Sequence, residues 1–271
     1  MTERLDQEVL KIDCKQAESV IIDFIKKTVE AAGAEGVVVG MSGGVDSSVV
    51  SVLCVRALGP ERVLGLIMPD LGITPKEDVE DAKTLAEKLG IRTRFIPINP
   101  VVDSFLKTVP TGADRIVKGN VRARTRMIFN YFFANALGYL VVGTGDRSEI
   151  LIGYFTKYGD GGVDFSPIAH FYKTQVRQFA TYLGLPEEII NKPASPQLWI
   201  GQQATDEIPV DYDVLDLILH GLFDLKMIPK EVASRLEVPV VLVDEVRRRF
   251  EVSVHKRIYP PGIENGESLR L

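Results

Sequence analysis

The chain has 271 residues, of which 45% are apolar and 25% charged, as in ordinary globular proteins. Its 32 basic and 37 acidic residues give a net charge of −5, which argues against a general nucleic-acid-binding protein. The two cysteines, Cys14 and Cys54, have the spacing of neither a zinc site nor a disulfide framework. No apolar run reaches membrane-spanning length, and the N-terminus is too polar for a signal peptide. We therefore expect a cytoplasmic protein that binds no membrane.

Apolar residues at helical spacing predict a first helix over residues 16–32, which ends at the glycines that follow it. The apolar run 37–39 then indicates a buried strand, and the periodic segment 45–57 indicates a second helix. Between this strand and helix lies a tight turn, residues 40–48, with the sequence Gly-Met-Ser-Gly-Gly-Val-Asp-Ser-Ser.

This glycine-rich turn has the features of an anion site. Gly43 and Gly44 carry no Cβ, so the backbone can bend there and approach a ligand closely. The first turn of the following helix has N–H groups without an intrahelical partner, and its dipole end is positive. Ser42, Ser47 and Ser48 add hydroxyl donors. The sequence therefore predicts a phosphate site, and the alternative is a strand–turn–helix connection that binds nothing.

Asp46 says more about this site. A carboxylate repels a phosphate unless a divalent cation lies between them, so Asp46 predicts a bound cation. No lysine follows the glycines, which distinguishes the turn from the Gly-Lys-Ser/Thr loop of the common nucleotide-binding proteins. The pattern Ser-Gly-Gly-x-Asp-Ser also resembles the pyrophosphate loop of the N-type ATP pyrophosphatases. Members of that superfamily cleave ATP between the α- and β-phosphates and adenylate a substrate.

Two further strands are predicted, over residues 62–68 and 92–98. The helix between them runs to Leu89, with Thr74 as its expected N-cap and Pro75 at its first position. Helices and strands thus alternate, which predicts an α/β fold with a doubly wound parallel sheet and helices on both faces. Ligands bind such sheets beyond the carboxyl ends of the strands, where the glycine-rich turn lies.

A long helix is predicted over residues 116–136, and its polar side carries Arg122, Arg124 and Arg126. The simplest interpretation is that this polar side of the helix faces solvent and binds nothing. Three arginines within five residues favour anion recognition by at least one of them, but the spacing does not identify which.

The strand predicted over residues 139–142 leads into a second glycine-containing turn, residues 143–149. Glu149 is a candidate second carboxylate for the cation proposed at Asp46. The alternative is an acidic residue that serves only the helix dipole.

The segment 153–167 is rich in glycine but also contains aromatic residues, which argues against plain disorder. It is a poor match to a calcium-binding loop, and we interpret it as a binding loop that closes over substrate. Further helices are predicted over residues 173–183, 212–225, 229–236 and 240–250. The basic cluster 255–257 follows them, and from its composition alone it would be an exposed terminal tail.

The order of several motifs resembles one family. The segments 119–127, 143–149, 155–164 and 255–257, together with the pyrophosphate loop, resemble the ammonia-dependent NAD synthetases over about residues 16 to 260. The resemblance implies the adenine nucleotide alpha hydrolase-like α/β fold, in a homodimer with the dinucleotide site near the subunit interface. It implies a single domain over residues 1–271 with a helical C-terminal part, about 209–271, and no glutaminase domain. Ammonia is then free or delivered by a separate partner.

The resemblance also implies roles for individual residues. The ATP-binding residues would be Gly40, Met41, Ser42, Gly43, Gly44, Val45, Asp46, Ser47, Thr144, Lys173 and Ser195. Asp46 and Glu149 would hold Mg²⁺, and together with Lys173 they would be the catalytic residues. Deamido-NAD would contact Arg124, Lys157, Asp164, His255 and Lys256. The chain departs from the family pattern around Thr144 and Ser195.

The implied reaction forms NAD from deamido-NAD, ATP and ammonia through an adenylate, with release of pyrophosphate and AMP. One alternative is another N-type ATP pyrophosphatase that forms an amide or modifies tRNA, although tRNA-modifying thiolases usually show paired cysteines and a basic extension. A second alternative is a nucleotide-sensing domain of the universal-stress type, which needs neither magnesium carboxylates nor the 153–167 loop.

Overall fold

The computed structural model describes residues 5–109 and 112–261, so both ends of the predicted 1–271 domain lie outside the described residues. Four parallel strands form one sheet, in the order β3-β2-β1-β4. Their bounds are β1 Gly36–Gly40, β2 Val63–Ile67, β3 Arg92–Phe95 and β4 Tyr139–Val142. The strand order reverses direction between β1 and β4, which are hydrogen-bonded neighbours far apart in the sequence. This is the doubly wound parallel sheet that the sequence predicts.

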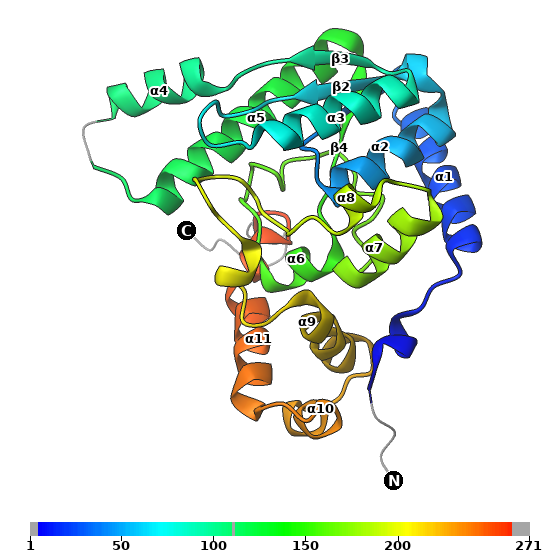
Figure 1. Cartoon of the computed structure of the whole chain (residues 1–271), viewed down its shortest axis with the longest axis vertical. Coiled ribbons are helices and arrows are strands. Elements are labelled where there is room, and N and C mark those ends of the chain that lie inside the picture. The colour runs from blue at the N-terminus through cyan, green and yellow to red at the C-terminus, as the bar shows by residue number, and fades with distance from the viewer. Residues whose placement is uncertain (1–4, 110–111, 262–271) are drawn as a thin grey trace, which may run out of the picture.

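Side chains of the strands alternate between two hydrophobic layers, because successive residues of a strand point to opposite faces. Val38, Leu66 and Val141 pack on the face covered by α4 and α5, whereas Val39 and Val142 pack on the face covered by α1, α2 and α7. Figure 1 shows the sheet between these two sets of helices. The prediction of helices on both faces is therefore confirmed.

The helices follow the predicted order closely. Their bounds are α1 Cys14–Ala31, α2 Val45–Leu58, α3 Lys76–Leu89, α4 Asn99–Thr108, α5 Arg115–Leu137, α6 Arg147–Ile152, α7 Lys173–Tyr182, α8 Glu187–Ile190, α9 Tyr212–Leu219, α10 Pro229–Leu236 and α11 Val240–Val252. Short 3-10 turns occur at Gln7–Leu10, Pro60–Arg62, Ala204–Asp206 and Val254–Lys256, and a π-helical turn at His220–Asp224.

Three local predictions differ from the structure. The N-cap of α3 is Pro75 and not Thr74, whose hydroxyl instead accepts a hydrogen bond from Asp70 N at 3.0 Å and closes the preceding turn. The third strand stops at Phe95, ahead of Pro97. The segment 212–225 is one α-helix followed by a π-helical turn. Helix α4 was not predicted, although Pro100 in its first turn is a helix-start signal.

Helices α9, α10 and α11 pack around an apolar core of their own, with Leu215, Ile218, Val232, Val243 and Val246 at its centre. Helix α9 also contacts α6 and α7, so this C-terminal helical part lies against the helices that follow β4 (Figure 1). Among the described residues, none of the helices combines the length and the apolar character that crossing a bilayer requires.

Candidate active site

The turn after β1 leaves the N-terminus of α2 open. Gly44 is the N-cap, and no side chain of the described residues caps the helix. Gly43 has φ +80°, and a Cβ there would lie 2.1 Å from the carbonyl oxygen of Asp78, so only glycine fits. Ser42 and Ser47 face each other with their hydroxyl oxygens 3.1 Å apart. The free N–H groups and hydroxyls suit an anion, as the sequence predicts.

The turn after β4 closes the N-terminus of its own helix. Asp146 is the N-cap of α6, and its carboxylate accepts a hydrogen bond from Glu149 N at 2.8 Å. The Asp146 side chain is fully buried, whereas Glu149 is partly exposed. This turn therefore presents carboxylates and few free donors.

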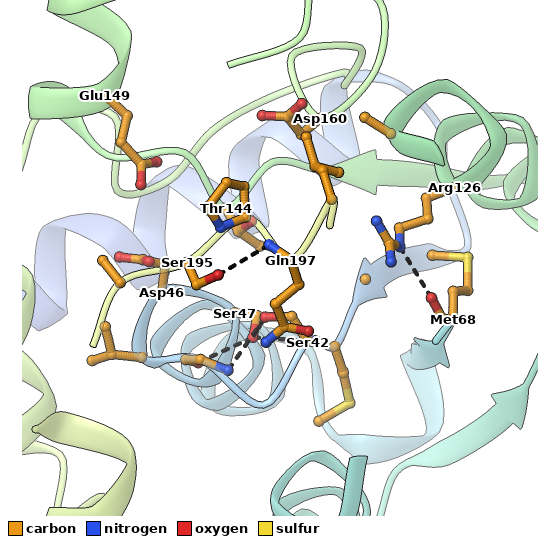
Figure 2. A pocket seen from close by; sticks show the side chains of 18 of the residues that line it. Ser42, Asp46, Ser47, Met68, Arg126, Thr144, Glu149, Asp160, Ser195 and Gln197 are labelled. Atoms are coloured by element: carbon orange, nitrogen blue, oxygen red, sulfur yellow. Dashed lines mark hydrogen bonds between the residues drawn. The ribbon is translucent and has the colours of Figure 1, made fainter. Parts of the chain in front are cut away.

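A cavity of about 260 Å³ lies between the two turns. It occupies the place where the strand order reverses, which is the usual ligand site of a doubly wound sheet. Its walls include Gly40, Met41, Ser42, Gly44, Val45, Asp46, Ser47, Thr144, Glu149, Lys173 and Ser195, all of which the sequence assigned to ATP or to the cation. In Figure 2, Asp46 and Glu149 lie at one end of the cavity and Arg126 at the other.

Lys173 is the central charged residue of the site. It begins α7, and its side chain is 1% exposed. Its Nζ lies 2.7 Å from Asp46 Oδ2, 2.7 Å from Asp146 Oδ2 and 3.1 Å from Glu149 Oε1. Three helices, α2, α6 and α7, thus bring one ammonium group and three carboxylates together.

Burial and the neighbouring carboxylates act in opposite directions on the pKa of Lys173 and in the same direction on the pKa of Glu149. Burial lowers the pKa of Lys173, but the charges of Asp146, Asp46 and Glu149 outweigh it and raise that pKa well above its ordinary value. Burial also raises the pKa of Glu149 well above its usual range, and repulsion from Asp146 adds to this effect. Lys173 therefore stays charged, and the raised pKa of Glu149 shows that one ammonium group does not offset the burial and crowding of the carboxylates.

The acidic cluster fits a hard divalent cation. Asp46, Asp146 and Glu149 each offer a carboxylate oxygen, and these atoms lie within 4.8 Å of one another. Asp46 Oδ1 is buried and has no hydrogen-bond partner within the described part of the chain. Oxygen donors of this kind are those that Mg²⁺ prefers. The sequence analysis missed Asp146 as a candidate, although it is an acidic residue in a turn already singled out.

Of Arg122, Arg124 and Arg126 on α5, Arg126 is the one that lines the cavity. It donates to the Met68 carbonyl at 3.0 Å, and burial lowers its pKa to about 10, so it remains a cation at neutral pH. Arg122 is instead paired with the buried Asp70, and the exposed Arg124 donates to the Lys157 carbonyl at 3.2 Å. Anion recognition by Arg126 therefore fits the geometry best.

Residues 192–198 form one wall of the cavity. Lys192 fastens this segment to the turn after β1, because its Nζ donates to Gly43 O at 3.0 Å and to Asp78 Oδ1 at 2.5 Å. The Ser195 hydroxyl donates to Gln202 O at 2.6 Å and accepts from Gln197 N at 3.2 Å (Figure 2). The Ser195 hydroxyl thus holds this wall together, and its assignment to ATP stays a prediction.

The segment 153–167 is folded into compact turns beside the cavity. Asp164 accepts hydrogen bonds from Tyr131 OH at 3.0 Å and Val141 N at 2.7 Å, which fixes the segment to α5 and β4. Lys256 donates to Gly153 O and Phe155 O, both at 2.7 Å. The sequence analysis also missed Asp160, which lines the cavity and accepts from Thr156 N at 2.9 Å.

The residues assigned to deamido-NAD lie apart from the ATP residues. Arg124, Lys157, Asp164, His255 and Lys256 are all outside the cavity lining. His255 and Arg124 are exposed. The assignment of this group of residues stays a prediction.

Comparison with known proteins supplies the family. The NAD synthase family model matches residues 18–260. The NH₃-dependent NAD⁺ synthetase of Hyperthermus butylicus is 54% identical over 254 residues, covering 94% of this chain and 92% of the relative. A structure of an NMN synthetase from Francisella tularensis aligns with a TM-score of 0.83 at 30% identity, over 94% of this chain and all of the other. An NH₃-dependent NAD synthetase from Campylobacter jejuni gives 0.79 at 30% identity, over the same shares. The chain belongs to the NAD synthase family.

Proposed function

We propose that this protein forms NAD from deamido-NAD, ATP and ammonia and releases AMP and pyrophosphate. One observation supports the proposal: one cavity joins a helix N-terminus that no described side chain caps to a buried lysine held by three carboxylates. The first feature suits the phosphates of ATP, and the second suits a cation that neutralises them. Membership of the NAD synthase family supports this assignment over other enzymes with a pyrophosphate loop.

In the first step, an oxygen of the nicotinate carboxylate bonds to the α-phosphorus of ATP, and the bond from that phosphorus to the β-phosphate oxygen breaks. The substrate carboxylate is itself the nucleophile, so the protein needs no activated serine or cysteine. Its task is to position the reactants and to stabilise the charge of the phosphates. The free N–H groups of the turn after β1 and the ammonium of Lys173 are placed for that task.

In the second step, the nitrogen of ammonia bonds to the activated carbonyl carbon, and the bond from that carbon to the AMP oxygen breaks. One proton leaves the nitrogen as the amide forms. The walls formed by residues 192–198 and 153–167 keep water away from the adenylate.

Asp46, Glu149 and Asp146 would hold Mg²⁺, and Asp46 Oδ1, which has no hydrogen-bond partner among the described residues, would be free to bind it. When bound, the ion neutralises phosphate charge and polarises the phosphoryl oxygen. Lys173 occupies the centre of the same carboxylates and supplies a fixed positive charge to them.

We further propose a homodimer in which α5 faces the partner and helps to complete the dinucleotide site. Ile128 and Phe132 lie one helical turn apart on α5 and are 58% and 64% exposed. Arg124, predicted to bind deamido-NAD, lies one turn earlier on the same face. Apolar exposure of this kind is typical of an interface, and the predicted substrate residues lie outside the ATP cavity. Light scattering gives the molar mass that tests this assembly.

The test of the activity uses the purified chain with ATP, Mg²⁺, deamido-NAD and an ammonium salt. We expect NAD and AMP in equal amounts, and pyrophosphate release that requires deamido-NAD. A parallel reaction with nicotinate mononucleotide separates NAD synthesis from NMN synthesis, and we expect the dinucleotide to react faster. Absence of AMP in both reactions would rule the proposal out. A cytoplasmic setting stays a prediction.

A further inference from the structure

Asp216, on α9 in the C-terminal helical part, is a fully buried carboxylate that the reaction does not use directly. Its Oδ1 accepts a hydrogen bond from Ser148 Oγ at 2.5 Å. Its Oδ2 accepts two more, from Thr174 N and Thr174 Oγ1, both at 2.8 Å. One side chain thus joins the first turn of α6 to the first turn of α7.

These two turns carry the charged centre. Ser148 lies between Asp146 and Glu149 on α6, and Thr174 follows Lys173 on α7. Lys173 N donates to Ser148 Oγ at 3.0 Å, which closes the connection between the two helices. The position of the lysine relative to the acids therefore depends on bonds that meet at a residue from another part of the chain (Figure 1).

Helix α9 makes a second contact with the same centre. Tyr212 lies one turn before Asp216, and its ring is 5.3 Å from Lys173 Nζ. The Tyr212 side chain is buried, and α9 therefore forms the wall behind the lysine.

Burying a fourth carboxylate costs free energy of desolvation. An apolar side chain at position 216 would often stabilise the packing equally well. Burial raises the pKa of Asp216 to about 7, against the effect of its hydrogen bonds to Ser148 and Thr174. Repulsion from Asp146 adds to the increase. Asp216 offsets this cost by fixing the orientation of the first turns of α6 and α7 relative to each other.

We infer that Asp216 is a positioning residue for the cation and phosphate site, so that the C-terminal helical part sets the geometry of the active centre. This inference rests on the proposed function. Groups that orient metal ligands from behind typically change metal affinity or activity by about 10- to 100-fold when they are removed.

The test measures Mn²⁺ binding by electron paramagnetic resonance in the presence of α,β-methylene-ATP, which is not cleaved between its first two phosphates. For Asp216→Ala we expect an Mn²⁺ dissociation constant about 10- to 100-fold above wild type. Asp216→Asn keeps an acceptor for Thr174, so we expect it to recover part of that loss. Ser148→Ala removes two hydrogen bonds, the one to Asp216 and the one from Lys173 N, without leaving a large cavity. We expect a smaller increase in the Mn²⁺ dissociation constant, which tests the inference even if Asp216→Ala does not fold.

Glu18→Gln is the matched control. Glu18 accepts hydrogen bonds from Arg56 and Tyr182, and Tyr182 ends α7 at the helix terminus opposite Lys173. We expect this variant to bind Mn²⁺ like wild type. Wild-type Mn²⁺ affinity in Asp216→Ala would overturn the inference. If Asp216→Ala does not fold, wild-type Mn²⁺ affinity in Ser148→Ala would overturn it. An equal loss of Mn²⁺ affinity in Glu18→Gln would overturn it as well. Failure of wild type to make NAD would instead overturn the proposed function, so the two failures are distinct.

Discussion

The helices that follow β1 and β4 begin at the same edge of the sheet but in different ways. Helix α2 starts at Gly44 without a side-chain cap among the described residues, so its first N–H groups face the cavity. Helix α6 starts at Asp146, whose carboxylate takes up the Glu149 N–H. The first turn suits an anion, and the second places its acids around Lys173 and suits a cation.

This difference shows how one topology yields complementary chemistry. Both turns follow parallel strands, so both lie at the same end of the sheet and can face one ligand. ATP with a bound cation needs both kinds of surface, and neither turn alone supplies both. Four changes test this division, from the largest expected effect to the smallest.

Lys173→Met should reduce stability most, because it leaves three acids near one another without their cation. Removing one partner of a buried ion pair costs about 3–5 kcal/mol. Added Mg²⁺ should restore part of this loss if the acids form a cation site. Denaturant unfolding with and without Mg²⁺ measures both effects.

Lys83→Met provides the comparison, because Lys83 pairs with the exposed Glu80 at 2.8 Å. A surface pair contributes about 0–1 kcal/mol, so we expect a small change that Mg²⁺ does not alter. A Lys173 variant that loses no more than Lys83→Met, or that ignores Mg²⁺, would contradict the cation site.

Asp46→Ala should remove adenylation. It takes away the carboxylate that links the anion turn to the acidic cluster, and we expect pyrophosphate release to fall by about 100- to 1,000-fold, the range for a lost electrostatic stabiliser. Asp103→Ala, on the exposed side of α4, is the control and should react like wild type. Near-normal pyrophosphate release by Asp46→Ala with Mg²⁺ and deamido-NAD would refute the role of Asp46.

Gly43→Ala should distort the anion turn. The residue has φ +80°, and the added Cβ would meet the Asp78 carbonyl oxygen at 2.1 Å. Gly33 has φ +61° with nothing within 4 Å, so Gly33→Ala carries only the left-handed backbone strain of about 1–2 kcal/mol. We expect Gly43→Ala to lose more stability than Gly33→Ala and also to lose affinity for α,β-methylene-ATP in calorimetry. Equal behaviour of the two variants would show that the tight approach to Asp78 is unimportant.

The smallest expected effect is the difference in unfolding free energy between Asp146→Ala and Asp146→Asn. Asparagine can still accept the Glu149 N–H, whereas alanine cannot, and a lost N-cap costs about 1 kcal/mol. Both variants lose the negative charge, but the asparagine NH₂ would face Lys173 Nζ where Asp146 Oδ2 lies at 2.7 Å. The difference in unfolding free energy therefore sets a lower limit for the contribution of the cap. Equal stabilities would mean that α6 does not depend on Asp146 for its start, and the contrast with α2 would disappear.

Local sequence patterns predict much of the fold. Apolar runs bounded by glycines predict β1, β2 and β4, and helical spacing predicts α1, α2, α5, α10 and α11. The error at the start of α3 occurs where two local preferences compete. Thr74 is a good N-cap by type, but its hydroxyl is used by Asp70 N in the turn before the helix.

The charged centre was only partly predictable. Asp46 and Glu149 were predicted from the two turns that carry them and Lys173 through a family resemblance, and the structure brings their side chains together. Asp146 was missed because a helix N-cap and a metal ligand have the same residue type in the same place. Asp216 carries no sequence signal for the site, since it lies 67 residues after Glu149 on a helix with an ordinary apolar pattern.

The amino-acid sequence by itself determined the parallel α/β fold and the anion turn, because hydrophobic periodicity and glycine conformations act over a few neighbouring residues. Only the tertiary structure decided which carboxylates surround Lys173, which arginine faces the cavity and which distant helix fixes their positions. Those relations depend on how α2, α5, α6, α7 and α9 pack together, and electrostatic energy varies with distances that no linear spacing specifies.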